Sequence, residues 1–210
     1  MLEQEYRSGV RDVILTPHFY MSREQAPLTV FKEKLRLLQD ASRERFPDLS
    51  LYLGFEVQAS GSLFDAFDSL EPLCLAGSRN FLMEFRNGDS VRHMKDRVRE
   101  AQSMGVSVIV AHAERYEVIQ EDVDSARSLT RMGAELQVNA DSIVGKGIER
   151  RTARKLIREN LVTYVAGDAH NTDTRTCRFA ECARYLARKY NDEYMRDLMA
   201  YNPHGILEEE

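Results

Sequence analysis

Short apolar runs alternate along this chain with segments of helical periodicity, and this alternation limits the folds that the sequence can adopt. The runs are apolar on both faces and bounded by turn residues, which is typical of buried parallel strands. Strands that alternate with helices indicate βαβ units and a parallel sheet. The runs are Val13-Ile14-Leu15, Leu49 to Val57, Phe81 to Phe85, Val106 to Ala111, Leu136-Gln137-Val138 and Leu161 to Ala166.

The segments between the runs carry apolar residues at helical spacing, so each predicted helix has one apolar stripe. Three stripes are clear: Val91, Met94, Val98 and Ala101; Val123, Ala126, Leu129 and Met132; and Phe179, Cys182, Ala183 and Leu186. Residues that favour helix ends stand before four of the runs, at Gly9, Gly105, Gly133 and Asn160. No low-complexity linker interrupts the pattern, so we predict a single α/β domain over residues 1–210.

Charge and composition exclude several classes of protein. The chain has 29 Lys+Arg against 34 Asp+Glu, a net charge of −5, which disfavours a general nucleic-acid binder. No run approaches the roughly 20 apolar residues of a bilayer span, and the first residues lack the apolar core of a signal peptide. Three cysteines form neither a disulfide framework nor a C-x-x-C pair. We therefore predict a cytoplasmic chain without membrane insertion; its oligomeric state stays open.

Polar residues that can bind metal stand at the ends of the apolar runs. In a parallel α/β barrel all strand C-termini open onto one face, where an active site is assembled. Oxygen and imidazole donors without thiolate suit Mn, Fe, Zn or Mg more than a structural zinc site. In chain order these positions are Thr16-Pro17-His18, Glu56, Glu84, His112 to Arg115, Asn139-Ala140-Asp141 and Asp168 to Asn171.

The five histidines provide a check on this interpretation. His18, His112 and His170 all follow apolar runs, a placement that chance would seldom produce. His93 falls at the start of a predicted helix and His204 in the tail, and we assign no site role to either.

These blocks together resemble the polymerase and histidinol phosphatase (PHP) superfamily. More narrowly, they are similar to the manganese-dependent protein-tyrosine phosphatases of bacterial capsule and exopolysaccharide operons. The resemblance runs in order from Gly9 to about Pro203. It rests on Thr16-Pro17-His18, Gly54-Phe55-Glu56, Met83-Glu84-Phe85, Ala111-His112-Ala113-Glu114-Arg115-Tyr116 and Gly167-Asp168-Ala169-His170-Asn171.

The resemblance implies a distorted seven-stranded (β/α) TIM-like PHP barrel that holds up to three metal ions. The ion expected first is Mn²⁺. It also implies a phosphotyrosine substrate on a capsule-regulating tyrosine kinase. Arg115 and Arg175 match arginines that face the substrate phosphate. By position, the metal ligands would be His18, Glu56, Glu84, His112, Asp168 and His170.

One departure from the family pattern is large. Family members open with a strand carrying Asp-x-His-x-His, and no His-x-His occurs in this chain. We therefore expect that the barrel's first strand and two ligands are missing, and favour a truncated sequence over a degenerate protein. Two alternatives stay open: a small-molecule phosphatase of the histidinol-phosphate type, and a non-catalytic remnant that binds phosphate through its arginines.

A cysteine-based phosphatase is the less favoured mechanism. Such enzymes need a Cys-x5-Arg loop whose backbone amides bind phosphate. Cys182 and Arg188 have this spacing, but the residues between them contain no glycine and continue a helical stripe. Cys74 and Arg79 are one residue too close. We predict structural roles for these cysteines.

Overall fold

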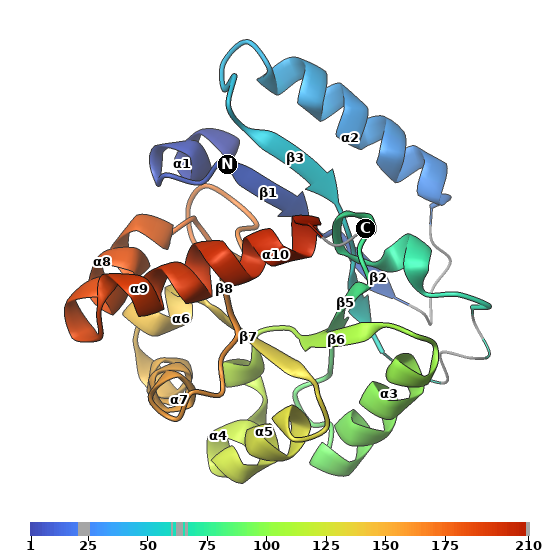
Figure 1. Cartoon of the computed structure of the whole chain (residues 1–210), viewed down its shortest axis with the longest axis vertical. Coiled ribbons are helices and arrows are strands. Elements are labelled where there is room, and N and C mark those ends of the chain that lie inside the picture. Colours follow the sequence, from blue (N-terminus) through green and yellow to red (C-terminus); the bar gives the residue numbers. More distant parts are fainter. Residues whose placement is uncertain (21–25, 60, 62–64, 66, 209–210) are drawn as a thin grey trace.

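The computed structural model describes residues 1–20, 26–59, 61, 65 and 67–208. Strands and helices alternate along the chain, as Figure 1 shows by colour. The strands are β1 (Asp12–Leu15), β2 (His18–Tyr20), β3 (Ser50–Leu53), β4 (Glu56–Gln58), β5 (Asn80–Glu84), β6 (Ser107–Val110), β7 (Glu135–Asn139) and β8 (Tyr164–Ala166). The predicted α/β class with parallel strands is confirmed.

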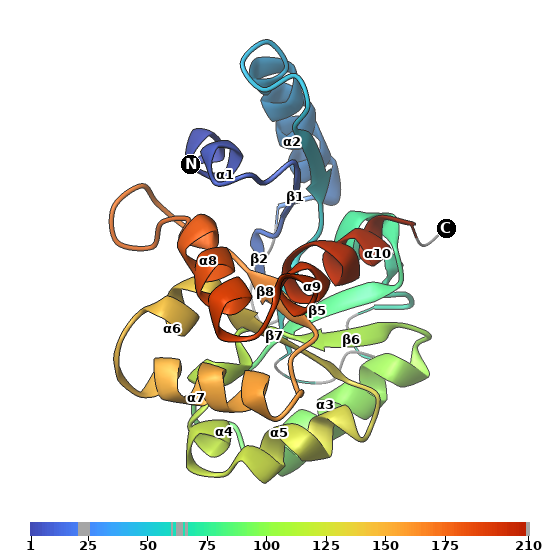
Figure 2. The same cartoon turned by 60° about the vertical axis from the view of Figure 1, so that its left-hand side comes forward.

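Helices flank these strands on the outside of the molecule (Figures 1 and 2). The α-helices are α1 (Leu2–Arg7), α2 (Leu28–Ser42), α3 (Val91–Ser103), α4 (Glu117–Glu121), α5 (Val123–Thr130), α6 (Ala140–Val144), α7 (Gly147–Arg158), α8 (Phe179–Lys189), α9 (Asp192–Arg196) and α10 (Asn202–Glu208). Short turns of other helix types are η1 (Glu71–Leu73), η2 (Leu75–Gly77), η3 (Ala113–Arg115) and the π-helical η4 (Asp197–Tyr201). In the part of the chain described here, no helix has the length and apolar character needed to cross a membrane.

All strand pairs are parallel, and their order follows the chain. The larger sheet has the order β2-β4-β5-β6-β7-β8, and the smaller one pairs β1 with β3. Since β1 runs on into β2 and β3 into β4, the smaller sheet extends the larger one. Among the described residues, the first strand β1 and the last strand β8 are not paired with each other.

An apolar cleft lies between β1 and β8. Its volume is about 1130 Å³, and its walls include Ile14, Leu82, Ile109 and Tyr164. One end of the cleft reaches His18, Glu56 and Asp168, residues that the sequence predicts at the site.

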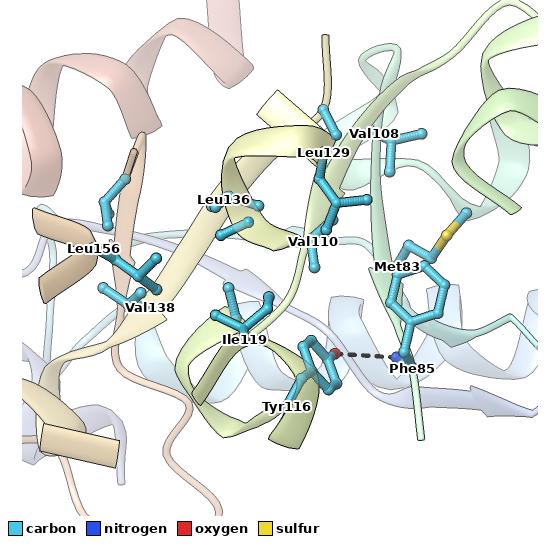
Figure 3. Close-up of a cluster of buried hydrophobic side chains, with 14 of the residues drawn as sticks. Met83, Phe85, Val108, Val110, Tyr116, Ile119, Leu129, Leu136, Val138 and Leu156 are labelled. Atoms are coloured by element: carbon cyan, nitrogen blue, oxygen red, sulfur yellow. Dashed lines mark hydrogen bonds between the residues drawn. The ribbon is translucent and has the colours of Figure 1, made fainter. Parts of the chain in front are cut away.

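Strands β5, β6 and β7 are largely buried on both faces. Alternate residues of β5, β6 and β7 pack against the outer helices, among them Met83, Val110 and Val138, all fully buried (Figure 3). The intervening Leu82 and Ile109 belong to a second apolar cluster with Tyr164. Full burial of such an aliphatic side chain stabilises the fold by about 1.5–3 kcal/mol.

The predicted helix ends are correct. Gly9, Gly105, Gly133 and Asn160 all have positive φ, between 52° and 94°, directly before the chain enters the next strand or its approach. Asn160 is the instructive one, because a non-glycine residue adopts this left-handed conformation at some cost. Its φ of 52° closes α7 so that the chain can turn towards β8.

Two details differ from the prediction. The run Leu49 to Val57 forms two strands, β3 and β4, with a break at Gly54 and Phe55. His18 does not lie in a loop after β1; it begins β2 and pairs with Glu56 at the start of β4. Two predicted site residues are therefore held by sheet register, which fixes them more firmly than a loop would.

Candidate metal centre

The six predicted ligands come from five places along the curved sheet. His18 and Glu56 stand side by side at the starts of β2 and β4, and Glu84 is the last residue of β5. His112 follows β6, and the block with Asp168 and His170 follows β8. The starts of β2 and β4 follow directly on the ends of β1 and β3, so His18 and Glu56 lie towards the same end of the sheets as the residues that follow the other parallel strands.

Two glutamates lie between two imidazoles. His18 Nδ1 is 3.1 Å from Glu56 Oε2 and 3.7 Å from Glu84 Oε2. On the other side, His112 Nε2 is 2.9 Å from Glu56 Oε1 and 3.4 Å from Glu84 Oε1. Donor atoms of His18, Glu56 and Glu84 all lie within 4.8 Å of one another, a spacing that one cation can span.

Asp168 and His170 complete the cluster. His170 Nε2 is 3.5 Å from His18 Nε2, and His170 Nδ1 is 3.4 Å from Asp168 Oδ1. The structure thus brings all six predicted ligands together. The two predicted arginines lie there as well: Arg115 Nη2 is 2.9 Å and Arg175 Nη2 is 2.7 Å from Asp168 Oδ2.

Two of the predicted ligands have an unusual backbone. His112 has a φ of 32° and Asp168 a φ of 46°, both in the left-handed region. Such conformations cost about 1–3 kcal/mol in a non-glycine residue, and they persist only where surrounding contacts enforce them. Each occurs within two residues of the end of its strand and turns the side chain towards the cluster.

The electrostatics reflect the crowding of carboxylates. Burial lowers the pKa of His112, but hydrogen bonds to Glu56 and Glu84 outweigh burial and raise it to about 9. Burial raises the pKa of Asp168, but the charges of Arg115 and Arg175 outweigh burial and lower it. Neighbouring carboxylates thus favour a positive charge on His112, and the arginines favour the ionised form of Asp168.

This donor set fits a divalent metal ion. Carboxylate oxygens and imidazole nitrogens suit Mn, Fe and Zn, and no thiolate is among them. Glu56 and Glu84 favour a positive charge beside them, as the raised pKa of His112 shows, and a divalent cation can supply such a charge. The cysteines lie elsewhere in the core: Cys74 and Cys182 are 3% and 0% exposed.

Strand β7 contributes Asn139, which the sequence analysis named only as part of the block Asn139-Ala140-Asp141. Asp141 lies in α6 and pairs with Arg178 at 2.7 Å, so it is not part of the cluster. Instead Asn139, the last residue of β7, donates to Asp168 Oδ2 at 2.7 Å. Alternation along β7 could have identified it, because Asn139 and Gln137 share one face of the strand.

The histidines predicted to lack a site role also lie outside the cluster. His93 is in the first turn of α3, where its backbone N–H donates to Ser90 Oγ. His204 pairs with Glu208 on the exposed surface of α10 at 3.3 Å.

A second cleft leads from the cluster to the surface. Its volume is about 570 Å³, and its inner end is formed by Glu84, His112 and Arg115. Its walls include Tyr116 and Ile148, the latter an exposed aliphatic residue at the start of α7. The cleft is large enough for an aryl side chain whose phosphate lies at the inner end.

Comparison with known proteins gives consistent similarities. A family model described as capsular polysaccharide synthesis, CpsB/CapC, matches residues 1–208. The chain is 26% identical to tyrosine-protein phosphatase CpsB of Streptococcus pneumoniae, over 99% of this chain and 88% of that protein. It is 27% identical to tyrosine-protein phosphatase YwqE of Bacillus subtilis, over 92% of this chain and 77% of that protein.

The fold is similar to a solved structure as well. That structure comes from work on YwqE of Bacillus subtilis and CpsB of Streptococcus pneumoniae, described there as metal-dependent tyrosine phosphatases. The TM-score is 0.87 at 25% identity, and the match covers 99% of this chain and 84% of the other.

Proposed function

The chain belongs to the CpsB/CapC family of capsular polysaccharide synthesis, and on that basis we propose that it is a metal-dependent phosphatase acting on protein phosphotyrosine. The observation that carries the proposal is the joint placement of ligands and arginines. Three imidazoles and three carboxylates converge, and both predicted arginines meet the same cluster at Asp168.

The proposed ligands are His18, Glu56, Glu84, His112, Asp168 and His170, with Mn²⁺ as the native ion. A divalent ion bound there supplies Lewis-acid stabilisation of phosphoryl oxygens and activates water as the nucleophile. The protein's own contribution is to hold the phosphate. Arg115 and Arg175 are planar, permanently charged donors that can bind phosphate oxygens in pairs while Asp168 orients them.

The second cleft fits the proposed substrate. A phosphate beside Arg115 would place its aryl group along the walls that include Tyr116 and Ile148. We propose further that the phosphotyrosine belongs to a capsule-regulating tyrosine kinase and that the chain acts in the cytoplasm.

One feature of the sequence favours a second candidate function, the binding of phosphotyrosine without hydrolysis. The chain contains no His-x-His pair, which the family resemblance associates with two further ligands. A protein that binds phosphotyrosine segments through Arg115 and Arg175 without hydrolysing them would need only the arginines.

The test compares two substrates under two metal conditions. Phosphate release from a phosphotyrosine peptide and from histidinol phosphate is measured with added Mn²⁺ and after chelation. The assay is run on this chain and on a version preceded by a strand carrying Asp-x-His-x-His. We expect Mn²⁺-dependent hydrolysis that favours the phosphotyrosine peptide, and greater turnover in the extended version.

Other outcomes select the alternatives. Preferred hydrolysis of histidinol phosphate would identify a small-molecule phosphatase. Peptide binding without hydrolysis in either version, abolished by Arg115→Ala, would identify a non-catalytic phosphate binder.

A further inference from the structure

A line of hydrogen bonds crosses the interior from the loop after β6 to the loop after β8. The backbone N–H of His112 donates to Gln137 Oε1 at 2.7 Å. Gln137 Nε2 donates to Asn139 Oδ1 at 2.7 Å, and Asn139 Nδ2 donates to Asp168 Oδ2 at 2.7 Å. The line therefore starts at one proposed ligand and ends at another.

The two amides occupy one face of β7. Leu136 and Val138 point to the opposite face, where they pack among buried side chains near Ile119 and Leu156 (Figure 3). Gln137 is 6% exposed and Asn139 is 1% exposed. Burying an amide is costly unless it is hydrogen-bonded, so a purely structural strand would favour apolar residues at both positions.

All three hydrogen bonds run in the same direction. Each acceptor amide is also the donor to the next group, and the last acceptor is the ionised Asp168. Bonds arranged in this way polarise one another, and the arrangement fixes which end of each amide carries the oxygen. Exchanging the oxygen and nitrogen of Asn139 would place its oxygen against the carboxylate of Asp168.

The line joins the two ligands whose backbones are strained. Positive φ occurs at four described non-glycine residues, and His112 and Asp168 are two of them. His112 lies beyond the end of β6, and Gln137 accepts the hydrogen bond from its backbone N–H. Asn139 donates a hydrogen bond to the side chain of Asp168. Asn139 also donates its backbone N–H to Glu114 Oε1 at 3.1 Å, which ties the same strand end to the loop that carries Arg115.

The consequence at Asp168 is a division between its two oxygens. Oδ2 accepts hydrogen bonds from Asn139 and Arg175, both at 2.7 Å, and forms an ion pair with Arg115 Nη2 at 2.9 Å. Oδ1 faces His170 Nδ1 at 3.4 Å, so it is the oxygen directed towards the cluster. With Oδ2 held by two hydrogen bonds and an ion pair, the carboxylate cannot rotate freely.

We propose that Gln137 and Asn139 are positioning residues that hold His112 and Asp168 in a metal-binding arrangement, with Asp168 Oδ1 as the ligand atom. This inference rests on the proposed metal site. Neither amide contacts the metal or substrate in this scheme. Both act through the ligands, as outer hydrogen-bond partners do in other metal sites.

The experiment measures Mn²⁺ affinity and stability separately. Asn139→Leu removes the last donor but keeps a side chain branched at Cγ, and Gln137→Met interrupts the line one step earlier but keeps an unbranched stem. Mn²⁺ dissociation constants are measured by titration calorimetry, and the metal-free free energy of unfolding is measured in urea. We expect each variant to bind Mn²⁺ about 10–100-fold more weakly than the unsubstituted chain.

Asn80→Leu is the matched control. Asn80 is a buried asparagine, 4% exposed, at the start of β5, four residues before Glu84 and at the opposite end of the strand. It also hydrogen-bonds a side chain, donating to Ser78 Oγ at 3.3 Å. We expect Asn80→Leu to lower the free energy of unfolding while Mn²⁺ affinity stays within about two-fold. The double variant Gln137→Met/Asn139→Leu should lose more affinity than Asn139→Leu alone, because the His112 N–H also loses its acceptor, but less than the product of the two single losses, because both variants break the same Gln137–Asn139 hydrogen bond.

Two results would contradict the proposal, and they have different meanings. Folded Asn139→Leu and Gln137→Met proteins that bind Mn²⁺ as the unsubstituted chain does would show that the amides serve stability alone. An unsubstituted chain that takes up no Mn²⁺ would remove the metal site and the positioning role with it. If Asn139→Leu does not fold, Gln137→Met becomes the test variant. Among the described residues, the Gln137 side chain bonds only the His112 backbone N–H and Asn139, so Gln137→Met leaves the hydrogen bond between Asn139 and Asp168 in place.

Discussion

Arg115 and Arg175 form ion pairs with the same oxygen of Asp168, at 2.9 and 2.7 Å, although the two arginines stand sixty positions apart in the sequence. A single carboxylate therefore sets the distance between two guanidinium groups. Both face the end of the sheet where the proposed ligands meet, and Arg115 also lines the cleft that leads outward. Two forked donors held this close can bind one phosphate group from two sides.

We predict that Arg115→Ala and Arg175→Ala each lower kcat/KM for a phosphotyrosine peptide by about 10²–10³-fold, because each removes a fixed donor to phosphoryl oxygens. Arg115→Lys should lose less, since the charge remains but the paired geometry does not. The measurement is steady-state kinetics with saturating Mn²⁺. Arg99→Ala, which breaks only a surface pair with Asp96 on α3, serves as the control. Unchanged kinetics in Arg115→Ala or Arg175→Ala would assign that arginine a surface role.

The sequence was sufficient to predict most of the parts of this site. The C-terminal ends of parallel strands lie on one side of a sheet, whichever helices and loops connect the strands. Residues that follow the apolar runs could therefore be assigned to one site before the detailed fold was known. The strand ends were also marked locally, by Gly105 and Gly133 before the strands and by His112 and Asp168 after them. These signals lie within a few residues of one another, where sequence patterns are most informative.

Long-range contacts explain what the sequence did not predict. The break between β3 and β4 falls at Gly54, where a Cβ would lie 2.7 Å from the Leu75 side chain and 3.0 Å from its Cα. Only the folded chain brings Leu75 there. Asn139 contacts the cluster and Asp141 does not, because α6 begins directly after β7 and turns Asp141 towards Arg178.

The cysteines provide a second prediction. Burial raises the pKa of Cys74 to about 12 and that of Cys182 to about 12, so neither forms a thiolate at neutral pH. Cys74→Ala and Cys182→Ala should keep phosphatase activity within a few-fold, whereas chelation should abolish it and added Mn²⁺ should restore it. The same peptide assay checks both. Activity that survives chelation but disappears in Cys182→Ala would mean that a cysteine is the nucleophile.

Tyr116 provides a prediction about stability. Its ring is 1% exposed, and its hydroxyl accepts from the backbone N–H of Phe85 at 3.0 Å, directly after the proposed ligand Glu84 (Figure 3). Tyr116→Phe leaves that buried N–H without its acceptor, so the free energy of unfolding should fall by about 1–3 kcal/mol. Urea unfolding measures the change. The control is Tyr201→Phe, at a residue that is 58% exposed, where we expect no change. Equal stability of Tyr116→Phe would show that the Phe85 N–H finds another acceptor.

The last prediction concerns the contact between α1 and the loop that carries His170 and Arg175. The thiol of Cys177 donates to Glu5 Oε2 at 2.7 Å, and Gln4 Nε2 donates to the Thr172 carbonyl at 3.4 Å. Burial raises the pKa of Glu5, an effect that the Cys177 hydrogen bond only partly offsets. The folded protein therefore binds a proton at Glu5 more tightly than the unfolded chain does. This contribution to stability is present in acid and is lost as the pH rises through the folded-state pKa.

Glu5→Gln removes the ionisation but keeps a carbonyl oxygen for the Cys177 thiol. At pH 7 we expect Glu5→Gln to raise Tm by up to a few degrees, and the gain should shrink as the pH is lowered through the range where Glu5 takes up its proton. Thermal unfolding followed between pH 4 and about pH 8 checks this. Glu3→Gln is the control on the same helix: Glu3 pairs with Arg7 at 2.6 Å and Arg45 at 3.3 Å, so its loss should give no gain. A lower Tm of Glu5→Gln at pH 7 would show that the ionised carboxylate stabilises the contact between α1 and the loop, contrary to the raised pKa.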